Sequence, residues 1–404
     1  MTKWKKLSAE AVKERVFGAL KQNVNFYKEN ILGVPASHLD GQVFAIDSPL
    51  LQDAPFLSTL IHNPNHIGCH TLGESEPFFK GTQDIERDLI EICSKEILKG
   101  EGPEFDGYVA AGGTEANMQA IWVYRNYFRN HYGFKNEEIA VICSADAHYS
   151  MVKAANVLST GLYSIEVDQE ERAISEESIL SVVSKAQDDG VKAFIVIANM
   201  MTTMFGSVDD PDSITEVLKT KEIPFKLHID GAYGGFNFPF SCEDHRLDYR
   251  NEDVSSITLD AHKMVQAPYG TGIFTCRKDL MKYASTDATY VAGGDYTLTG
   301  SRSGANAVAV WMILMRHGPY GWKEKIFVLQ NRTNWLCEML DEKHISYFRH
   351  PKSNIVTLKA EQVGAELAAE YGLVPDNHSN PKWFKIVVME HVTMENLIPF
   401  VEKL

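Results

Sequence analysis

The sequence predicts an α/β protein with a large domain built on a mostly parallel sheet and a small C-terminal α+β domain. The chain has 404 residues, which is more than one small core needs. Between residues 60 and 304, short apolar runs rich in β-branched residues alternate with longer amphipathic segments. The last hundred residues group helices first and strands after them. These observations divide the chain into a helical arm at 1–59, a large domain at 60–304 and a small domain at 305–404.

The strands expected in the large domain are continuous apolar runs, as buried parallel strands are. Helical spacers between them imply right-handed crossovers. The expected strands are Ile139–Cys143, Tyr163–Val167, Ala193–Ala198, Lys226–Ile229, Ser256–Leu259 and Gly272–Cys276. A helix is expected over 8–30, an irregular arm over 34–55 and another helix from Asp84 to Leu98.

The C-terminal part is predicted to mix helices with two strands. The expected helices are Ala305–Arg316, Trp322–Lys343 and Thr393–Lys403, and the expected strands are Ile355–Lys359 and Lys385–Met389.

Composition excludes several classes of function. The net charge of −15 argues against a nucleic-acid partner. No run approaches the roughly 20 apolar residues that a membrane helix needs. The six cysteines are scattered without a CxxC pair, so neither a zinc site nor a disulfide framework is expected, and no metal is predicted. A reducing cytoplasm is the simplest setting.

A glycine pair at a helix start is the first feature that carries chemistry. Gly112 and Gly113 precede Thr114 at the beginning of a long helix. Glycines let a backbone approach an anion closely, and free N–H groups at the helix start favour a phosphate. The sequence lacks both the Walker A and the GxGxxG spacing. Taken alone, such a helix start is more often structural.

Three further residues follow strand ends, where an open α/β sheet places its ligands. His148 lies after the strand ending at Cys143, Asp230 ends its own strand, and Lys263 follows the next one. A flat imidazole can stack on a ring, an aspartate can keep a pyridine nitrogen protonated, and a desolvated lysine can form a Schiff base. Singly they could be a buried histidine, a helix cap and a surface lysine. Their order together indicates pyridoxal 5′-phosphate (PLP).

These residues resemble the group II PLP-dependent amino-acid decarboxylases over most of the chain, from about Pro64 onward. The resemblance lies in GGTEAN at 112–117, HIDGAYGG at 228–235 and DAHKM at 260–264. Met201-Thr202-Thr203 is similar to a Gly-Thr-Thr segment of that family, with Met201 in place of the glycine. Residues 299–304 are most similar to the archaeal tyrosine/aspartate and bacterial histidine branches. The resemblance implies the fold-type I, PLP-dependent transferase-like fold.

The resemblance also implies roles for individual residues. Lys263 would carry the cofactor and Asp230 would pair with its ring nitrogen. Ala232 and His148 would lie on opposite faces of the ring. The other expected cofactor contacts are Thr203 near the ring and Gly112, Gly113, Thr114, Asp260 and His262 around the phosphate. Asp260 is an unusual residue there, since a carboxylate repels a phosphate, and it could instead be protonated, bonded through the backbone or turned away. His262 could serve the phosphate or the carboxylate.

Substrate contacts are expected from loops. Tyr290 would protonate Cα, with Tyr296 as the second candidate, and Gly293 and Gly294 would let that loop move. Arg302 would either clamp a substrate carboxylate or tie the two domains together.

The side-chain pocket is expected from a polar loop. Its candidates are Asn63, His66, His70 and Lys80. The cations among them favour an acidic substrate such as aspartate over an aromatic one. The resemblance further implies a homodimer with shared active sites, with the N-terminal arm across the interface.

The reaction expected is decarboxylation of an L-amino acid, either aspartate- or glutamate-like or aromatic. An aminotransferase or a carbon–carbon lyase on the same fold is the alternative, and DAHKM favours the decarboxylase. A PLP-binding protein without activity is the third reading, which the intact lysine, aspartate and histidine oppose.

Overall fold

The computed structural model describes residue 30 and residues 32–33, 40–43, 55–72, 79–102, 105–287 and 294–404. The arm predicted at 34–55 and the helix predicted at 8–30 lie almost entirely outside these residues. Within them, no helix combines the length and the apolar character that crossing a membrane requires.

A seven-stranded sheet forms the centre of the molecule, in the order β2-β8-β7-β6-β5-β3-β4. Its strands are β2 (Phe105–Ala110), β3 (Ile139–Ser144), β4 (Gly161–Ile165), β5 (Ala193–Asn199), β6 (Phe225–Gly231), β7 (Val254–Asp260) and β8 (Gly272–Arg277). All neighbours are parallel except β8, which is antiparallel to β2 and β7. The predicted fold class is confirmed, and each of the six expected strands is present. The strand β2 was not predicted.

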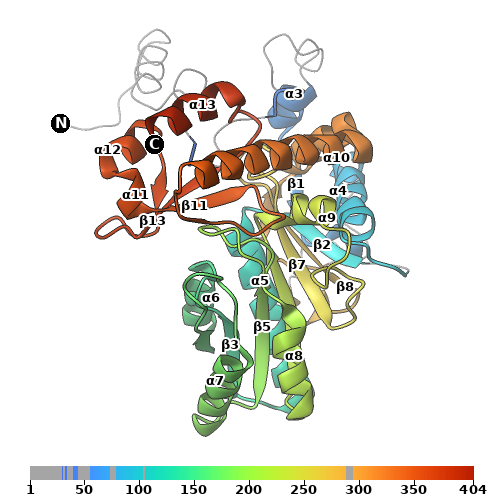
Figure 1. Ribbon diagram of the computed structural model, residues 1–404. Coiled ribbons are helices and arrows are strands. Elements are labelled where there is room, and N and C mark those ends of the chain that lie inside the picture. Colours follow the sequence, from blue (N-terminus) through green and yellow to red (C-terminus); the bar gives the residue numbers. More distant parts are fainter. Residues whose placement is uncertain are drawn as a thin grey trace, which may run out of the picture.

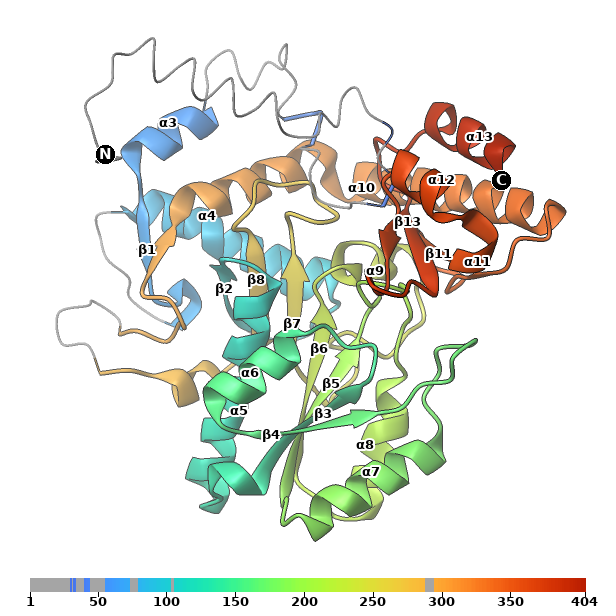
Figure 2. The ribbon, with the colours of Figure 1, turned by 90° about the vertical axis from the view of Figure 1, so that its left-hand side faces the viewer.

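Helices cover both faces of this sheet (Figures 1 and 2). One face packs against α5 (Gly113–Tyr132) and α6 (Ser150–Leu158), and the other against α7 (Glu176–Asp188) and α8 (Pro211–Thr220). Alternate residues of β5 enter the two cores: Ile195 and Ile197 join the first, whereas Phe194 and Val196 join the second. Because both faces are covered, the inner strands β3 and β5 are buried at every position, and their sequences are mostly apolar.

The N-terminal side of the described chain contributes short elements beside the sheet. These are α3 (Pro55–His62), β1 (Asn65–Ile67), a 3₁₀ turn at His70–Leu72 and α4 (Lys80–Glu91), which continues as a π-helical segment over Ile92–Ile97. The helix predicted at 84–98 therefore begins four residues earlier. The strand β1 pairs with β9 (Ser301–Ser303) in antiparallel register.

The C-terminal part begins with the long helix α10 (Gly304–Glu342), which kinks at Gly318. Gly318 has φ 62° and ψ 174°, and Pro319 follows it, so the two predicted helices meet at this kink. A four-stranded antiparallel sheet follows, in the order β10-β11-β13-β12. Its strands are β10 (Tyr347–Phe348), β11 (Ile355–Lys359), β12 (Val374–Pro375) and β13 (Trp383–Val387); helices α11 (Ala360–Val363), α12 (Ala365–Glu370) and α13 (Met394–Lys403) complete this part.

This second sheet contacts the carboxyl edge of the central one. Tyr233, which follows β6, donates a hydrogen bond to Asn354 (2.9 Å), and Lys385 of β13 donates one to the carbonyl of Thr203 after β5 (3.0 Å). The exact boundaries at 59/60 and 304/305 stay a prediction.

Candidate active site

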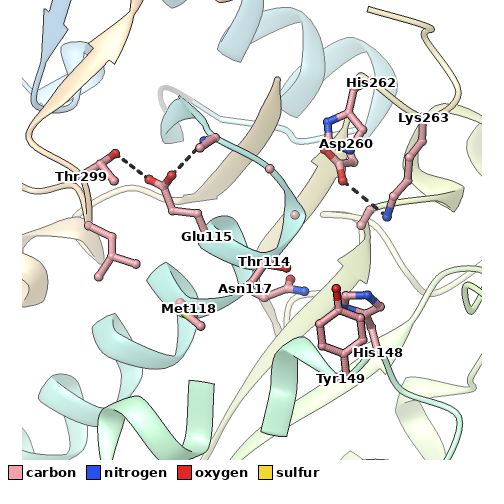
Figure 3. A pocket seen from close by; sticks show the side chains of 15 residues that line it. Thr114, Glu115, Asn117, Met118, His148, Tyr149, Asp260, His262, Lys263 and Thr299 are labelled. Atoms are coloured by element: carbon pink, nitrogen blue, oxygen red, sulfur yellow. Dashed lines mark hydrogen bonds and ion pairs between the residues drawn. The ribbon is translucent and has the colours of Figure 1, made fainter. Parts of the chain in front are cut away.

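The carboxyl ends of the strands and the start of α5 enclose a cavity of about 540 Å³ (Figure 3). Strands β3, β6 and β7 run parallel, so their carboxyl ends meet at one edge of the sheet. The cavity is lined by Ala111, Gly112, Gly113, Thr114, Glu115, Asn117, Met118, His148, Tyr149, Ala232, Asp260, His262, Lys263, Leu298 and Thr299. Eight of the residues predicted to contact the cofactor are therefore brought together around one space.

Lys263 and Asp260 face each other across one wall of the cavity. The Nζ atom of Lys263 lies 3.4 Å from Oδ2 of Asp260, and Nδ1 of His262 lies 3.0 Å from Oδ1 (Figure 3). Burial would raise the pKa of Asp260, but His262, Lys263 and the backbone N–H of Gly113 together hold this pKa below its usual value. Asp260 is therefore an ionised carboxylate paired with a lysine.

The start of α5 forms a close-fitting cradle beside this wall. A Cβ atom added at Gly113 would lie 3.0 Å from Cβ of Ala232 and 3.1 Å from Oδ2 of Asp260. Glycine leaves this space free, and the N–H groups of a first helical turn have no partner within their own helix. Thr114 adds a hydroxyl to the same turn. The arrangement suits a phosphate group.

Asp230 ends β6 and is held by the protein at both oxygens. Its Oδ1 accepts the N–H of Ala232 (3.1 Å), and its Oδ2 accepts the side-chain amide of Asn117 (2.9 Å). The residue is 6% exposed. These two hydrogen bonds hold the carboxylate in a fixed orientation at the carboxyl end of β6.

His148 lines the cavity from the loop after β3. Its Nδ1 lies 2.9 Å from the hydroxyl of Ser150 and accepts the backbone N–H of the same residue. Burial lowers the pKa of His148 and the charge of Lys263 lowers it further, while Asp230 opposes both effects. A neutral ring of this kind can lie flat against an aromatic cofactor.

Arg302 and His70 lie in a separate buried cluster. Arg302 donates to both oxygens of Glu86 and to the carbonyls of Val109 and Gly68. His70 lies 3.1 Å from the Glu86 carboxylate and His66 lies 2.5 Å from it.

The charges of this cluster are balanced within the protein. Burial would raise the pKa of Glu86, but Arg302, His66 and His70 hold this pKa well below its usual value. The side chains of the two histidines and Glu86 lie close enough for metal ligands, yet the guanidinium of Arg302 already neutralises their carboxylate. The guanidinium therefore has an internal partner, which favours a structural tie over a substrate clamp.

The remaining predicted residues lie outside the lining of this cavity. Asn63 and Lys80 are exposed, at the end of α3 and the start of α4. Thr203 is exposed as well, with its carbonyl bound by Lys385. Tyr290 lies outside the described residues, and Tyr296 accepts a hydrogen bond from Gln119 through its backbone carbonyl.

The sequence patterns assigned no functional role to Glu86, Asn117 or Lys385. Glu86 lies on the buried face of α4 with Gln83, Leu89 and Ile90, and an acid in that apolar stripe was a usable signal. Lys385 is 5% exposed, and burial and the charge of Lys263 lower its pKa to about 8.

Comparison with known proteins decides the family. The sequence model described as "Pyridoxal-dependent decarboxylase conserved domain" matches residues 84–356. The chain belongs to this family of decarboxylases.

Individual relatives agree with that assignment. The chain is 48% identical to a tryptophan decarboxylase of Clostridium sporogenes over 98% of its length and 95% of the relative. It is 31% identical to a probable L-tyrosine/L-aspartate decarboxylase of Methanothrix thermoacetophila, over 87% and 91% of the two chains. The crystal structure of L-methionine decarboxylase from Streptomyces sp. 590 has the same fold, with a TM-score of 0.78 at 20% identity over 98% of this chain and 95% of that one.

The protein is thus a PLP-dependent amino-acid decarboxylase. Decarboxylation, and not transamination or cleavage of another carbon–carbon bond, is the activity that the family supports. The cavity fits this cofactor, because Lys263 and a glycine-lined helix start line it, and the buried carboxylate of Asp230 accepts the N–H of Ala232 from the same lining. When bound, PLP supplies an electron-accepting ring that stabilises the charge left on Cα after CO₂ departs.

Proposed function

We propose that this decarboxylase acts on an aromatic L-amino acid, with tryptophan as the leading candidate. The relative that is 48% identical over 98% of the chain is named a tryptophan decarboxylase. The cavity lining includes Met118, Leu298 and Tyr149, which suit an apolar side chain.

An acidic substrate has less support. The prediction of an acidic substrate depended on the cations of the polar loop. The carboxylate of Glu86 already pairs with His66, His70 and Arg302. Burying a second carboxylate needs a free cation. Apart from Lys263 and the two histidines, the described residues that line the cavity offer none.

We assign the cofactor contacts as follows. Lys263 carries PLP, Asp230 binds the ring nitrogen, and His148 and Ala232 hold the two faces of the ring. The phosphate lies at Gly112, Gly113 and Thr114, and His262 lies beside it. Asp260 forms an ion pair with Lys263, whose Nζ atom lies 3.4 Å from Oδ2 of Asp260. Tyr290 is proposed as the proton donor to Cα, and Thr203 as a neighbour of the cofactor.

A substrate panel tests the assignment. The protein is incubated with PLP and each of tryptophan, tyrosine, phenylalanine, aspartate, glutamate and methionine, and the release of CO₂ is measured. We expect kcat/KM for at least one aromatic substrate to exceed that for aspartate by more than 100-fold, which is about 2.7 kcal/mol in transition-state binding. Lys263→Ala is the matched control and should lose activity on every substrate. A preference for aspartate or glutamate would overturn the proposed substrate while leaving the family assignment intact.

We also propose a cytoplasmic homodimer. The six cysteines are free thiols, five of them buried, which suits a reducing compartment. Light scattering of the purified protein should give twice the chain mass of 45.3 kDa. A monomer that decarboxylates at full rate would exclude shared active sites.

A further inference from the structure

The side-chain amide of Asn117 connects the two groups assigned to the cofactor ring. Asn117 lies in the second turn of α5 and is 1% exposed. Its Nδ2 atom donates to Asp230 Oδ2 at 2.9 Å and to Ser150 Oγ at 3.1 Å. Both hydrogens of the amide are therefore used, one toward the aspartate and one toward the loop that carries His148.

A chain of buried hydrogen bonds fixes the orientation of this amide. The NH₂ group of Asn117 faces Asp230, and its carbonyl oxygen therefore faces His228. The Nε2 atom of His228 lies 3.0 Å from that carbonyl and must carry a proton. Burial lowers the pKa of His228 to about 4, so its ring is neutral and Nδ1 accepts from the hydroxyl of Ser256 at 2.6 Å. Ser256 in turn accepts the hydroxyl of Tyr124.

All donors in this chain point the same way, from Tyr124 to Asp230. Burial raises the pKa of Tyr124 well above its usual value, which keeps its hydroxyl protonated. Hydrogen bonds aligned in series polarise one another, most strongly in a dry interior.

A branch of the same chain fixes His148. The backbone N–H of Ser150 donates to Nδ1 of His148 at 3.2 Å, and a backbone N–H can only donate. Nδ1 is therefore unprotonated and the proton of the neutral ring is on Nε2. The hydroxyl of Ser150 accepts from Asn117 and donates to the same Nδ1 at 2.9 Å.

We propose that Asn117 is a positioning residue that sets Asp230 against the ring nitrogen of PLP and His148 against its face, and that His228 holds Asn117 in place. The inference rests on the proposed roles of Asp230 and His148. Partners behind a functional group tune its orientation and charge, as the partners of metal ligands do. The contact between Asn117 and Asp230 spans 113 residues of sequence, so the fold alone creates it.

The test compares two cofactors in the full-length protein. Dissociation constants are measured by absorbance for PLP and for its 1-deaza analogue, in which a C–H replaces the ring nitrogen. Asn117→Asp has nearly the same shape but places an acceptor against Asp230. We expect it to weaken PLP at least tenfold more than the analogue. Asn126→Asp on the same helix, whose amide donates to the Tyr283 carbonyl, is the control and should change neither constant more than twofold.

Two further variants separate the branches and guard against misfolding. Ser150→Ala removes the hydroxyl between Asn117 and His148 but leaves the contact of Asn117 with Asp230, and it should weaken both cofactors equally. His228→Gln keeps an N–H toward Asn117 and should retain the preference for PLP over the analogue within threefold. His228→Leu has no such N–H and should reduce this preference at least tenfold. Thermal unfolding of each apo-protein verifies folding.

Each other result rejects a defined part of the inference. Equal losses for PLP and its analogue in Asn117→Asp, or no loss at all, would overturn the role of Asn117. Equal behaviour of the two His228 variants would overturn the role of His228. If the wild-type protein binds both cofactors equally well, the assignment of Asp230 to the ring nitrogen fails instead.

Discussion

Glu86, Asp230 and Asp260 are buried carboxylates, and each is balanced in a different way. Glu86 pairs with Arg302, Asp260 with Lys263, and Asp230 accepts an amide and a backbone N–H. A charge removed from water is tolerated only with such partners. Asp230 alone has no cation within ion-pair distance among the described residues, so its charge remains available to a ligand.

The Glu86 cluster gives a prediction for stability. Glu86→Gln leaves the guanidinium of Arg302 buried without its counter-charge, since both side chains are at most 4% exposed. Removing one partner of a buried ion pair costs about 3–5 kcal/mol. We expect urea unfolding at pH 7 to show a loss of this size in the free energy of unfolding.

A neighbouring acid provides the control. Glu91 pairs with Lys95 on the same helix, and its side chain is 61% exposed. Glu91→Gln should change stability by less than about 0.5 kcal/mol. Because the pKa of Glu86 is depressed in the folded state, its contribution is complete above its usual pKa of 4.5 and falls as the pH drops further. A gap between wild type and Glu86→Gln that grows below pH 4.5 would contradict this account.

The roles of individual residues could be predicted where they depend on the order of motifs along the chain. Lys263 and Asp230 follow successive apolar runs, so the sequence alone brings them to one edge. The partner of Arg302 lies 216 residues away, and no local pattern shows that Glu86 neutralises it. The clamp considered for Arg302 and the preference for an acidic substrate both depended on a free charge that the folded chain has paired.

At the scale of elements, apolar runs predicted the strands but not their directions. The run Gly272–Cys276 reads like its neighbours, yet β8 is the one antiparallel strand. The strand β2 was not predicted, because Asp106 and Gly107 interrupt its apolar pattern. The folded chain accommodates both: the Asp106 carboxylate accepts the N–H of Asp279, and a Cβ at Gly107 would lie 2.5 Å from the Phe274 carbonyl.

The kink in α10 gives a prediction with a matched pair of glycines. Gly318 has φ 62° and ψ 174°, an essentially glycine-only conformation that costs another residue about 1–3 kcal/mol, and nothing lies within 4 Å of its added Cβ. Gly318→Ala should therefore destabilise by this amount through the backbone alone. Gly321→Ala, three residues later in regular helix, should stabilise by about 0.5–1 kcal/mol. Thermal unfolding measures both, and changes of the same sign would show that the kink is not what makes Gly318 necessary.

At the scale of the whole molecule, the active site joins distant parts of the chain. The start of α5, the loop after β3 and the ends of β6 and β7 supply the predicted cofactor contacts, and the second sheet meets the same edge through Lys385. A ligand that touches all these elements can bind only when they are assembled. Cofactor binding and folding are therefore linked.

This linkage predicts how PLP changes thermal stability. Free PLP at 100 times its dissociation constant should stabilise the folded state by about 2.7 kcal/mol, or about 3 °C in Tm for a chain of this length. Lys263→Ala should show a smaller rise at the same PLP concentration, because the covalent part of the binding is lost. Pyridoxal without its phosphate should also raise Tm less, because the hydrogen bonds proposed between the phosphate and the helix start at Gly113 and Thr114 are then lost. Differential scanning calorimetry across a range of PLP concentrations measures all three. A Tm that does not move with PLP in the wild-type protein would mean that PLP does not bind the folded state in preference to the unfolded one, which would contradict the assigned cofactor site.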